Sequence, residues 1–309
     1  MKKALVILVV LLLAAGAVFG QQRTLVGYVS SNFNDTFQGY LMTQFRAYFA
    51  DKPQYTVEFQ DAQEDVVKQQ DQVNNLIAKG AKALVVVPVN TSAMAPITKA
   101  AADAKIPLVY LNRNPYGTKN PPRNVYYVGS QEIAAGQLQA ESLGPMLNGQ
   151  GGVCILMGKL DNEGAVLRTK GNEDVLKAKF KGIKVLAKET GNWQRDQGMS
   201  ITENWITTYG ANLKAILANN DEMALGAAQA LRNARRTDVI VMGVDAIPDA
   251  RTAVANGTLA ATVLQDDKGQ GQGAAAAVVG ALTGKPAKPI TWVPFVYIDK
   301  NNIAQHPVR

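Results

Sequence analysis

Apolar and polar positions alternate along the chain in two rhythms. Continuous apolar runs of about four to eight residues have the length of buried strands, and the segments between them repeat apolar positions at helical spacing. In the first part of the chain the expected strands are 25–29, 55–59, 83–89 and 107–111, and the expected helices are 37–49, 65–79 and 92–104. Continuous apolar strands separated by helices are typical of a parallel sheet covered on both faces.

The same rhythm restarts after residues 112–124, which are rich in Pro, Gly and Asn. A strand at 125–128 follows this segment directly. The next expected strands are 151–157, 183–187, 215–218 and 239–244, and the next expected helices are 165–180, 195–209, 221–233 and 248–256. Two further strands, 261–264 and 293–298, come too late to belong simply to the second unit. We therefore predict two α/β units between which the chain crosses several times.

The beginning of the chain has the pattern of an export signal. Residues 1–3 form a basic segment with two lysines, residues 4–19 form an unbroken apolar run, and small residues stand three and one places before Gln21. We predict that residues 1–20 are a signal peptide and that the mature chain is periplasmic or otherwise extracytoplasmic. The alternative is an uncleaved membrane anchor.

Charge and reactive residues exclude several classes of protein. Cleavage after Gly20 removes two of the 32 basic residues and none of the 25 acids, which leaves a net charge of +5. This charge is spread along the chain, so we expect no nucleic-acid partner. His306 is the single histidine and Cys154 the single cysteine. They cannot supply a zinc site, a histidine-based triad or an internal disulfide.

Two pairs of adjacent acids, at 221–222 and 266–267, could suggest glycoside hydrolysis. Neighbours in sequence do not flank a scissile bond from opposite sides, however. We therefore expect a protein that is not an enzyme and that needs neither a cofactor nor a metal.

Polar and aromatic side chains stand directly after nearly every expected strand. They are Asn32, Asn34, Asp35 and Phe37; Asn90; Asn112 and Arg113; Asp161, Asn162 and Arg168; Asn192 and Trp193; Asn220 and Asp221; Asp245; and Gln265 and Asp266. In open parallel sheets, ligands bind beyond the carboxyl ends of the strands. Two units facing each other would thus form a cleft lined by both.

The mixture of residue types in this set has a chemical meaning. Amides, carboxylates and guanidinium groups hydrogen-bond neighbouring hydroxyls, and an aromatic ring stacks on a C–H face, so the set suits a sugar or polyol. Each residue also has a structural alternative. Asp221 could only cap a helix, Asp245 could only fix a turn, and Phe37 and Trp193 could only fill the core.

Four segments of the chain resemble periplasmic sugar-binding proteins of ABC transporters, in particular the ribose and galactose/glucose group. They are "AKGAKALVVVPVN" (78–90), "NNDEMALGA" (219–227), "GVDAIPDA" (243–250) and "GTLAATVLQD" (257–266), and their order matches as well. The resemblance begins at Thr24 and runs to the end of the chain. It implies the type I periplasmic binding protein fold, an α/β architecture of two Rossmann-like lobes with parallel sheets, flanked by helices and joined by a three-segment hinge.

The resemblance also implies the lobe limits and the ligand contacts. The N-terminal lobe would be 22–130 plus 265–292, and the C-terminal lobe 131–264 plus 293–309. The implied ligand contacts are Asp35, Phe37, Asn112, Arg113, Asn162, Arg168, Trp193, Asn220, Asp245 and Gln265. Phe37 and Trp193 would hold the ligand ring between the lobes. Asn220 would contact the ligand, while Asp221 would cap the helix that begins there.

Departures from the family pattern leave the ligand open. Arg113 resembles the ribose pattern and Trp193 the galactose pattern, while Asn162 and Gly164 stand where galactose-type proteins have a His and an Asp. Residues 148–152 lack the carboxylates of a calcium loop, so no calcium is expected. The segments "GNWQRDQ" (191–197) and "VGSQE" (128–132) resemble binding proteins for inositol.

The family likeness implies partners and a mode of action. We expect a monomer that captures a neutral monosaccharide or cyclic polyol, of the ribose, galactose/glucose, xylose or inositol class. It would deliver this small molecule to a membrane ABC permease. The alternative is presentation of the ligand to a chemoreceptor or sensor kinase.

Overall fold

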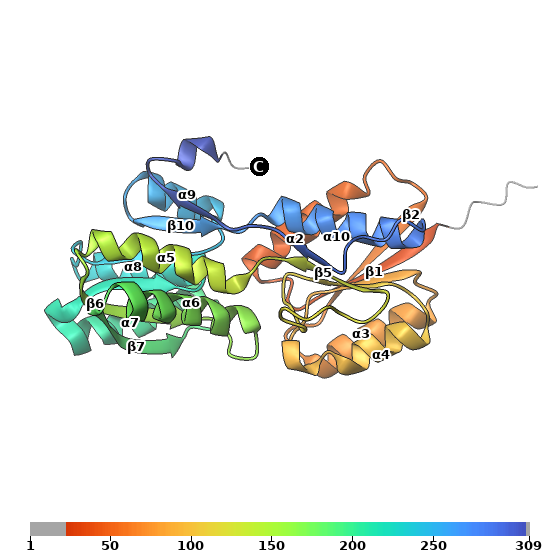
Figure 1. Cartoon of the computed structure of the whole chain (residues 1–309), viewed down its shortest axis with the longest axis horizontal. Helices are drawn as coiled ribbons and strands as arrows, with labels where there is room; N and C mark the ends of the chain where they lie inside the picture. Colours follow the sequence, from red (N-terminus) through yellow and green to blue (C-terminus); the bar gives the residue numbers. More distant parts are fainter. Residues whose placement is uncertain (1–22, 307–309) are drawn as a thin grey trace, which may run out of the picture.

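Two sheets form the centres of two lobes that lie side by side along the long axis of the molecule (Figure 1). The computed structural model describes residues 23–306, so the predicted signal peptide lies outside the described residues. Each sheet has six strands, in the order β11-β5-β4-β3-β1-β2 in the first lobe and β12-β10-β9-β8-β6-β7 in the second. The predicted fold class, two lobes with parallel-dominated sheets flanked by helices, is confirmed.

The first lobe is parallel throughout. Its elements are β1 (Thr24–Ser30), α2 (Thr36–Tyr48), β2 (Tyr55–Asp61), α3 (Val66–Ala78), β3 (Ala83–Val86), the 3-10 turn η1 (Thr91–Ala93), α4 (Ala95–Asp103), β4 (Leu108–Leu111), β5 (Val125–Gly129), α10 (Asp267–Leu282) and β11 (Ile290–Trp292). Side chains of β1 alternate between the faces of the sheet. Val26 and Tyr28 pack with residues of α2 and α10, while Val29 packs with residues of α3 and α4.

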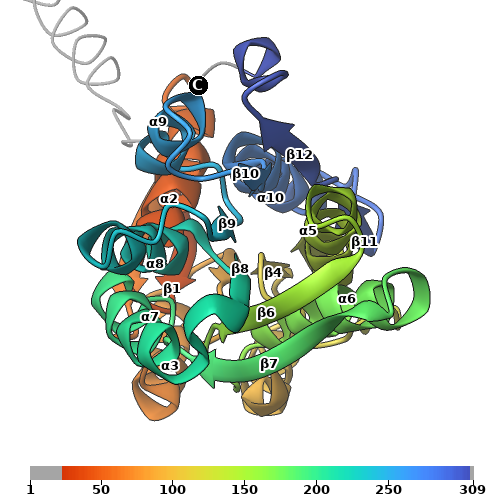
Figure 2. The ribbon, with the colours of Figure 1, turned by 90° about the vertical axis from the view of Figure 1, so that its left-hand side faces the viewer.

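The second lobe has the same plan with one antiparallel edge. Its elements are α5 (Glu132–Met146), β6 (Gln150–Met157), α6 (Glu163–Lys179), β7 (Gly182–Thr190), α7 (Arg195–Tyr209), η2 (Gly210–Asn212), β8 (Leu213–Ala218), α8 (Asp221–Asn233), β9 (Ile240–Met242), α9 (Pro248–Ala255), β10 (Ala261–Leu264), β12 (Val296–Asp299) and η3 (Ile303–Gln305). Figure 2 shows α5 and α6 on one side of the sheet and α7 and α8 on the other. Cys154, the free cysteine of β6, is buried in this core. β12 runs antiparallel to β10.

The chain passes from one sheet to the other three times. The passages lie between β5 and α5, between β10 and α10, and between β11 and β12. The ends of β5 and β10 thus lie where the lobes meet, which places the residues that follow them beside the cleft. The lobe limits at residues 130, 264 and 292 stay a prediction.

Two sequence-based assignments differ from the structure. The single strand expected at 293–298 is split: β11 ends at Trp292 in the first sheet, residues 293–295 cross between the lobes, and β12 begins at Val296 in the second sheet. Helix α5 was not predicted. Its apolar positions lie all around it because it packs on the sheet and also against α6, so it lacks the one-sided pattern of a surface helix.

No helix within residues 23–306 combines the length and the apolar character needed to cross a membrane.

Candidate ligand-binding site

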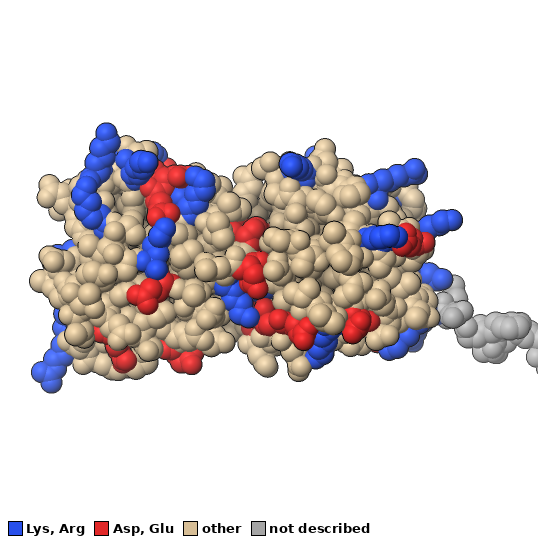
Figure 3. Space-filling model, turned by 90° about the horizontal axis from the view of Figure 1, so that it is seen from below, with Lys and Arg blue, Asp and Glu red and all other residues tan. Residues whose placement is uncertain are grey.

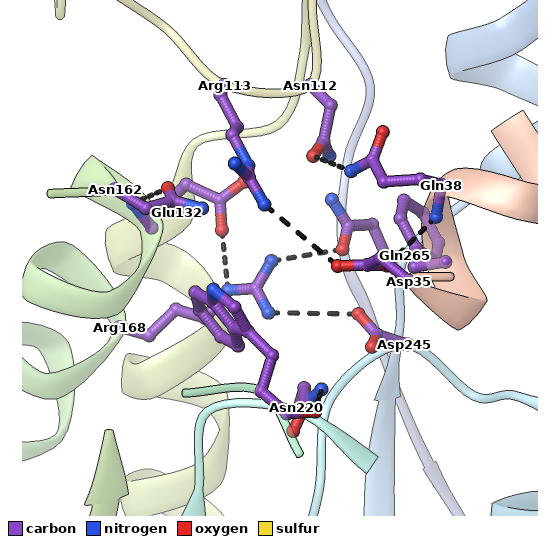
Figure 4. Close-up of a pocket in the computed structure, with 13 residues that line it drawn as sticks. Asp35, Gln38, Asn112, Arg113, Glu132, Asn162, Arg168, Asn220, Asp245 and Gln265 are labelled. Atoms are coloured by element: carbon purple, nitrogen blue, oxygen red, sulfur yellow. Dashed lines mark hydrogen bonds and ion pairs between the residues drawn. The ribbon is translucent and has the colours of Figure 1, made fainter. Parts of the chain in front are cut away.

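A pocket between the lobes brings together all ten residues that the family resemblance implied as ligand contacts, but not the other polar residues that follow the strands, such as Asn90, Asp161 and Asp266. Figure 4 shows their side chains converging from both sides. The pocket is lined by Asp35, Phe37, Asn112, Arg113, Asn162, Arg168, Trp193, Asn220, Asp245 and Gln265, and in addition by Gln38, Glu132 and Gly164. Their role as ligand contacts stays a prediction.

The first-lobe wall begins at the N-terminus of α2. The Asp35 carboxylate caps this helix by accepting a hydrogen bond from the Gln38 backbone N–H at 3.0 Å. Phe37 is buried in the first-lobe core and also lines the pocket. The second carboxylate oxygen of Asp35 lies 3.9 Å from a guanidinium nitrogen of Arg113. The helix start therefore presents an acid and an aromatic ring side by side.

The residues after β4 complete the first-lobe wall. The Gln38 side-chain amide donates to Asn112 Oδ1 at 3.2 Å, and Asn112 Nδ2 donates to Gln270 Oε1 at 3.1 Å. Arg113 donates to the Pro88 carbonyl at 2.9 Å. Both side chains are buried, so these bonds fix the direction in which they point into the pocket.

Arg168 is the centre of the second-lobe wall. Its Nε donates to Glu132 Oε2 at 2.6 Å, one Nη donates to the Asn219 carbonyl at 2.6 Å, and the other donates to Gln265 Oε1 at 3.0 Å. The Asp245 carboxylate lies 3.7 Å from the guanidinium. Burial alone would lower the pKa of Arg168. The negative charges of Glu132 and Asp245 outweigh the effect of burial, so the pKa of Arg168 is raised.

Close packing of α5 and α6 makes the pair of Arg168 and Glu132 possible. A methyl group on Gly136 of α5 would lie 1.9 Å from the carbonyl oxygen of Arg168, and one on Gly171 of α6 would lie 2.2 Å from the carbonyl oxygen of Ile133. Only glycine lets the two backbones approach this closely. The contact holds Glu132, at the start of α5, beside the guanidinium.

Trp193 and Asn220 are joined to each other at the mouth of the pocket. Asn220 Nδ2 donates to the Trp193 carbonyl at 3.1 Å, and its Oδ1 accepts from the Met223 backbone N–H at 3.0 Å. The centroid of the Trp193 ring lies 5.7 Å from the carbon of the Arg168 guanidinium. Trp193 has a φ of 68°, in the left-handed region, and such backbone strain often marks a functional segment.

Asp245 follows β9 with a φ of 121°, an unusual value for a residue with a Cβ. Its carboxylate is buried in the pocket wall, and this burial raises its pKa well above the ordinary value. Asp221, Asp35 and Glu132 act in the same direction, and Arg168 opposes them. A buried carboxyl group with a shifted pKa in a strained turn is typical of a functional site.

Asp221 does not cap α8, contrary to the prediction. Asn220 is the capping residue, because its side chain accepts the Met223 N–H. The Asp221 carboxylate is buried one position further on. It accepts hydrogen bonds from the Thr262 hydroxyl at 2.7 Å and the Ile247 backbone N–H at 2.9 Å. Burial raises its pKa to about 7. Asp221 thus ties α8 to β10 and to the turn before α9.

Several polar atoms of the pocket residues have no hydrogen-bond partner within residues 23–306. They are Gln38 Oε1, Arg113 Nε, Trp193 Nε1 and Gln265 Nε2, and all four are buried. One is an acceptor and three are donors. A ligand that both donates and accepts hydrogen bonds would match this set, as hydroxyl groups do.

Gln38 and Glu132 were not predicted as site residues. Gln38 lies one residue after Phe37, on the first turn of the helix at which Asp35 and Phe37 were predicted as contacts. Glu132 ends the segment "VGSQE", which had only suggested inositol binding. Little in the sequence indicated Glu132, because Arg168, with which it forms an ion pair, is distant along the chain.

Residues 23–306 contain no group of three or more His, Cys, Asp and Glu side chains placed to hold a metal ion.

Comparison with known proteins identifies the class to which this fold and pocket belong. Residues 26–286 match the family model of the periplasmic binding protein domain, and the chain belongs to this family. Its members are solute-binding proteins and not enzymes, which confirms that part of the prediction.

Individual relatives and structures extend this similarity. The chain is 39% identical over 283 residues to a protein of Rhizobium meliloti named as a rhizopine-binding protein, covering 91% of each chain. It is 35% identical over 245 residues to a xylitol-binding protein of Mycolicibacterium smegmatis, covering 79% of this chain and 69% of that one. An ABC transporter solute-binding protein of Bacillus halodurans with bound myo-inositol superposes with a TM-score of 0.87 at 34% identity, covering 93% of this chain and 98% of the other.

Proposed function

We propose that this chain is an exported solute-binding protein that captures a neutral monosaccharide or cyclic polyol between its lobes and delivers it to an ABC permease. The observation that carries the proposal is the pocket itself. It combines amides, carboxylates and guanidinium groups with two aromatic rings, all at the carboxyl ends of strands from both lobes.

The charges of the pocket favour a ligand without a strong charge of its own. Three carboxylates, of Asp35, Glu132 and Asp245, face two guanidinium groups, of Arg113 and Arg168. Arg168 is already paired with Glu132, and Arg113 lies near Asp35. A phosphate or carboxylate ligand would meet no excess of positive groups. Hydroxyl groups can instead share both kinds of partner.

Two aromatic side chains give the pocket its apolar part. Phe37 belongs to the first lobe and Trp193 to the second, and both line the pocket. The C–H faces of a sugar or cyclitol ring can stack on such surfaces. We propose that the ligand ring lies between them, so that only the closed arrangement of the lobes completes the site.

Within this ligand class, a cyclic polyol is the first candidate. The segments around Trp193 and Glu132 resemble inositol-binding proteins, and the similar Bacillus halodurans protein holds myo-inositol. A second relative is named for xylitol, also a polyol. Ribose, xylose and galactose or glucose remain members of the proposed class.

The mechanism we propose is hinge closure. Contacts between the lobes join Thr36 to Glu222 at 2.9 Å and Lys159 to Glu64 at 3.1 Å, both at the rim of the cleft. Figure 3 shows acidic side chains gathered along the boundary between the lobes on the face seen from below. Such polar contacts are weak in water, so a ligand can shift the balance toward the closed state by its own contacts.

The test is a thermal-shift panel on the chain from Gln21 with ribose, xylose, arabinose, glucose, galactose and myo-inositol. A ligand at a hundredfold excess over its Kd stabilises by about 2.7 kcal/mol, so tight binding raises the Tm clearly. A large shift with one compound supports the proposal and identifies the ligand. A panel without any shift would contradict the proposed ligand class.

A further inference from the structure

Glu163, in the first turn of α6, reaches from the second lobe to the first. Its Oε1 accepts a hydrogen bond from the backbone N–H of Asn114 at 2.6 Å. Asn114 follows β4 of the first lobe, so this bond crosses the cleft. Neither residue was singled out in the sequence as a ligand contact, and Glu163 is absent from the lining of the ligand pocket.

The second carboxylate oxygen of Glu163 is buried and unpartnered. The residue as a whole is partly exposed, but Oε2 has no access to water and no hydrogen-bond partner among residues 23–306. Within the same residues no Lys or Arg nitrogen lies within ion-pair distance of Glu163, in contrast to Glu132. The single bond from Asn114 is thus the main compensation for a carboxylate removed from water.

The charged and titratable groups around Glu163 do not neutralise it fully. Glu132, at the start of α5, repels a negative charge there. Arg113 and Arg168 attract one, but Arg113 donates to the Pro88 carbonyl and Arg168 to Glu132. Tyr127 of β5 is also near, and the charge of Glu163 contributes to the raised pKa of Tyr127.

Burial therefore dominates, and it raises the pKa of Glu163 to about 8, with the charge on Glu132 acting in the same direction. The Asn114 N–H and the two arginines oppose the shift without cancelling it. We expect that separation of the lobes breaks the Asn114 contact and admits water to the carboxylate, which would return the pKa of Glu163 to the range of an ordinary glutamate.

We propose that closure of the lobes on the ligand is coupled to uptake of one proton by Glu163, so that the protein captures its ligand together with a proton. The proton comes from solvent as the carboxylate is buried against Asn114, and it sits on Oε2 while Oε1 keeps the Asn114 bond. Opening returns the carboxylate to water and releases the proton with the ligand. This inference rests on the proposed hinge closure.

The coupling has a defined sign. Glu163 binds more protons in the closed state than in the open state between the two pKa values, so affinity is highest at low pH in this range and falls as pH rises. We expect Kd to rise by up to about tenfold for each pH unit between about pH 5 and about pH 8. Above about pH 8, Glu163 no longer makes the affinity depend on pH.

The first experiment compares Glu163→Gln with the unchanged chain by isothermal titration calorimetry from about pH 5.5 to about pH 8.5. The probe is myo-inositol, or the panel compound with the largest thermal shift if that is another one. Glutamine keeps an acceptor for the Asn114 N–H and carries no charge. We expect it to bind up to about a thousandfold tighter than the unchanged chain near pH 8, with a flatter pH profile.

Asp245 also titrates in the pocket, so some pH dependence should remain in both proteins, and only their difference reports on Glu163. The matched control is Glu173→Gln. Glu173 lies on the same helix, but it is partly exposed and paired with Lys188 at 2.7 Å. Its profile should follow that of the unchanged chain.

A second measurement counts the protons directly. The binding enthalpies of the unchanged chain and of Glu163→Gln near pH 7 are measured in buffers of different ionisation enthalpy, and each slope gives the number of protons taken up. We expect the unchanged chain to take up about one proton more than Glu163→Gln. Equal slopes, or parallel pH profiles for the two proteins, would overturn the coupling and leave the proposed function standing. A panel in which no compound binds would remove both.

Discussion

The two lobes build opposite walls of one pocket in different ways. In the first lobe, the pocket side chains are held mainly by neutral groups. Asn112 lies between two glutamine amides, and Arg113 is fixed by a backbone carbonyl. The charges of Asp35 and Arg113 approach only to 3.9 Å. Substitution of one side chain in this wall would therefore leave most of the other hydrogen bonds of the wall in place.

In the second lobe, charge is concentrated. Arg168 and Glu132 form a buried ion pair, and the same guanidinium also supports Gln265. Trp193 and Asp245 have positive φ values, as does Asn112 in the first wall, but asparagine tolerates the left-handed region better than either. Removing one partner of a buried pair leaves the other charge without compensation. The difference suggests that the second wall is the one on which binding depends most, and four substitutions test this order.

Arg168→Met should have the largest effect. It leaves the buried Glu132 carboxylate unpaired, at a cost of about 3–5 kcal/mol in stability, and it removes the support of Gln265. We expect a lower Tm and a loss of affinity of about a thousandfold or more, measured by thermal unfolding and calorimetry. Lys170→Met, on the same helix but exposed, is the control. Affinity within about tenfold of the unchanged chain would remove Arg168 from the centre of the site.

Trp193→Ala should abolish tight binding and leave the fold intact. The substitution removes one of the two aromatic rings that line the pocket and the unpartnered Nε1–H, so we expect affinity to fall about a hundredfold, or about 2.7 kcal/mol. Trp292→Ala, at the edge of the first sheet and outside the pocket lining, should leave affinity unchanged. If Trp193→Ala unfolds the chain, this residue is structural and its assignment to the site is wrong.

Phe37→Leu should weaken binding less, by about tenfold, because leucine still fills the first-lobe core and only the aromatic contact, worth about 0.5–1.5 kcal/mol, is lost. Calorimetry beside Trp193→Ala sharpens the comparison directly. Equal losses for the two substitutions would mean that the walls contribute alike, contrary to the asymmetry argued above.

Asp221→Asn should have almost no effect on affinity and change only the pH dependence of stability. Because burial raises the pKa of Asp221 to about 7 in the folded chain, the folded state binds more protons there than the unfolded state. Its contribution is fully present below the ordinary aspartate pKa and is lost as pH rises through about 7. The asparagine variant should lose this decline in urea unfolding measured from about pH 4 to about pH 8. An unchanged decline would show that another group causes it.

The alternation of apolar runs was sufficient to predict the fold class and most elements. The run 83–89 is buried throughout, and its first four residues form a strand of the parallel sheet, so its apolar composition alone identifies it. Site residues such as Asp35, Asn162 and Asn220 could be found because each follows a strand and begins a helix. Their position at the strand ends is a local property of the chain.

What the sequence could not show depends on contacts between distant segments. The pair of Glu132 and Arg168 exists only because two glycines let α5 and α6 approach. The difference between Asn220 and Asp221 turns on where a helix starts, to within one residue. The strand expected at 293–298 was divided because apolar patterning does not reveal that a chain leaves one sheet for another.

The late return of the chain to its first lobe has a consequence for how the protein is made. Helix α10 packs on α2, and β11 pairs with β5, yet the whole second lobe separates these partners along the chain. A polypeptide emerging from a ribosome or a translocon therefore completes most of its second lobe before the first lobe can close its core. We expect the later-synthesised lobe to mature first, and pulsed hydrogen exchange during refolding should protect β6 and β8 before β1 and β5.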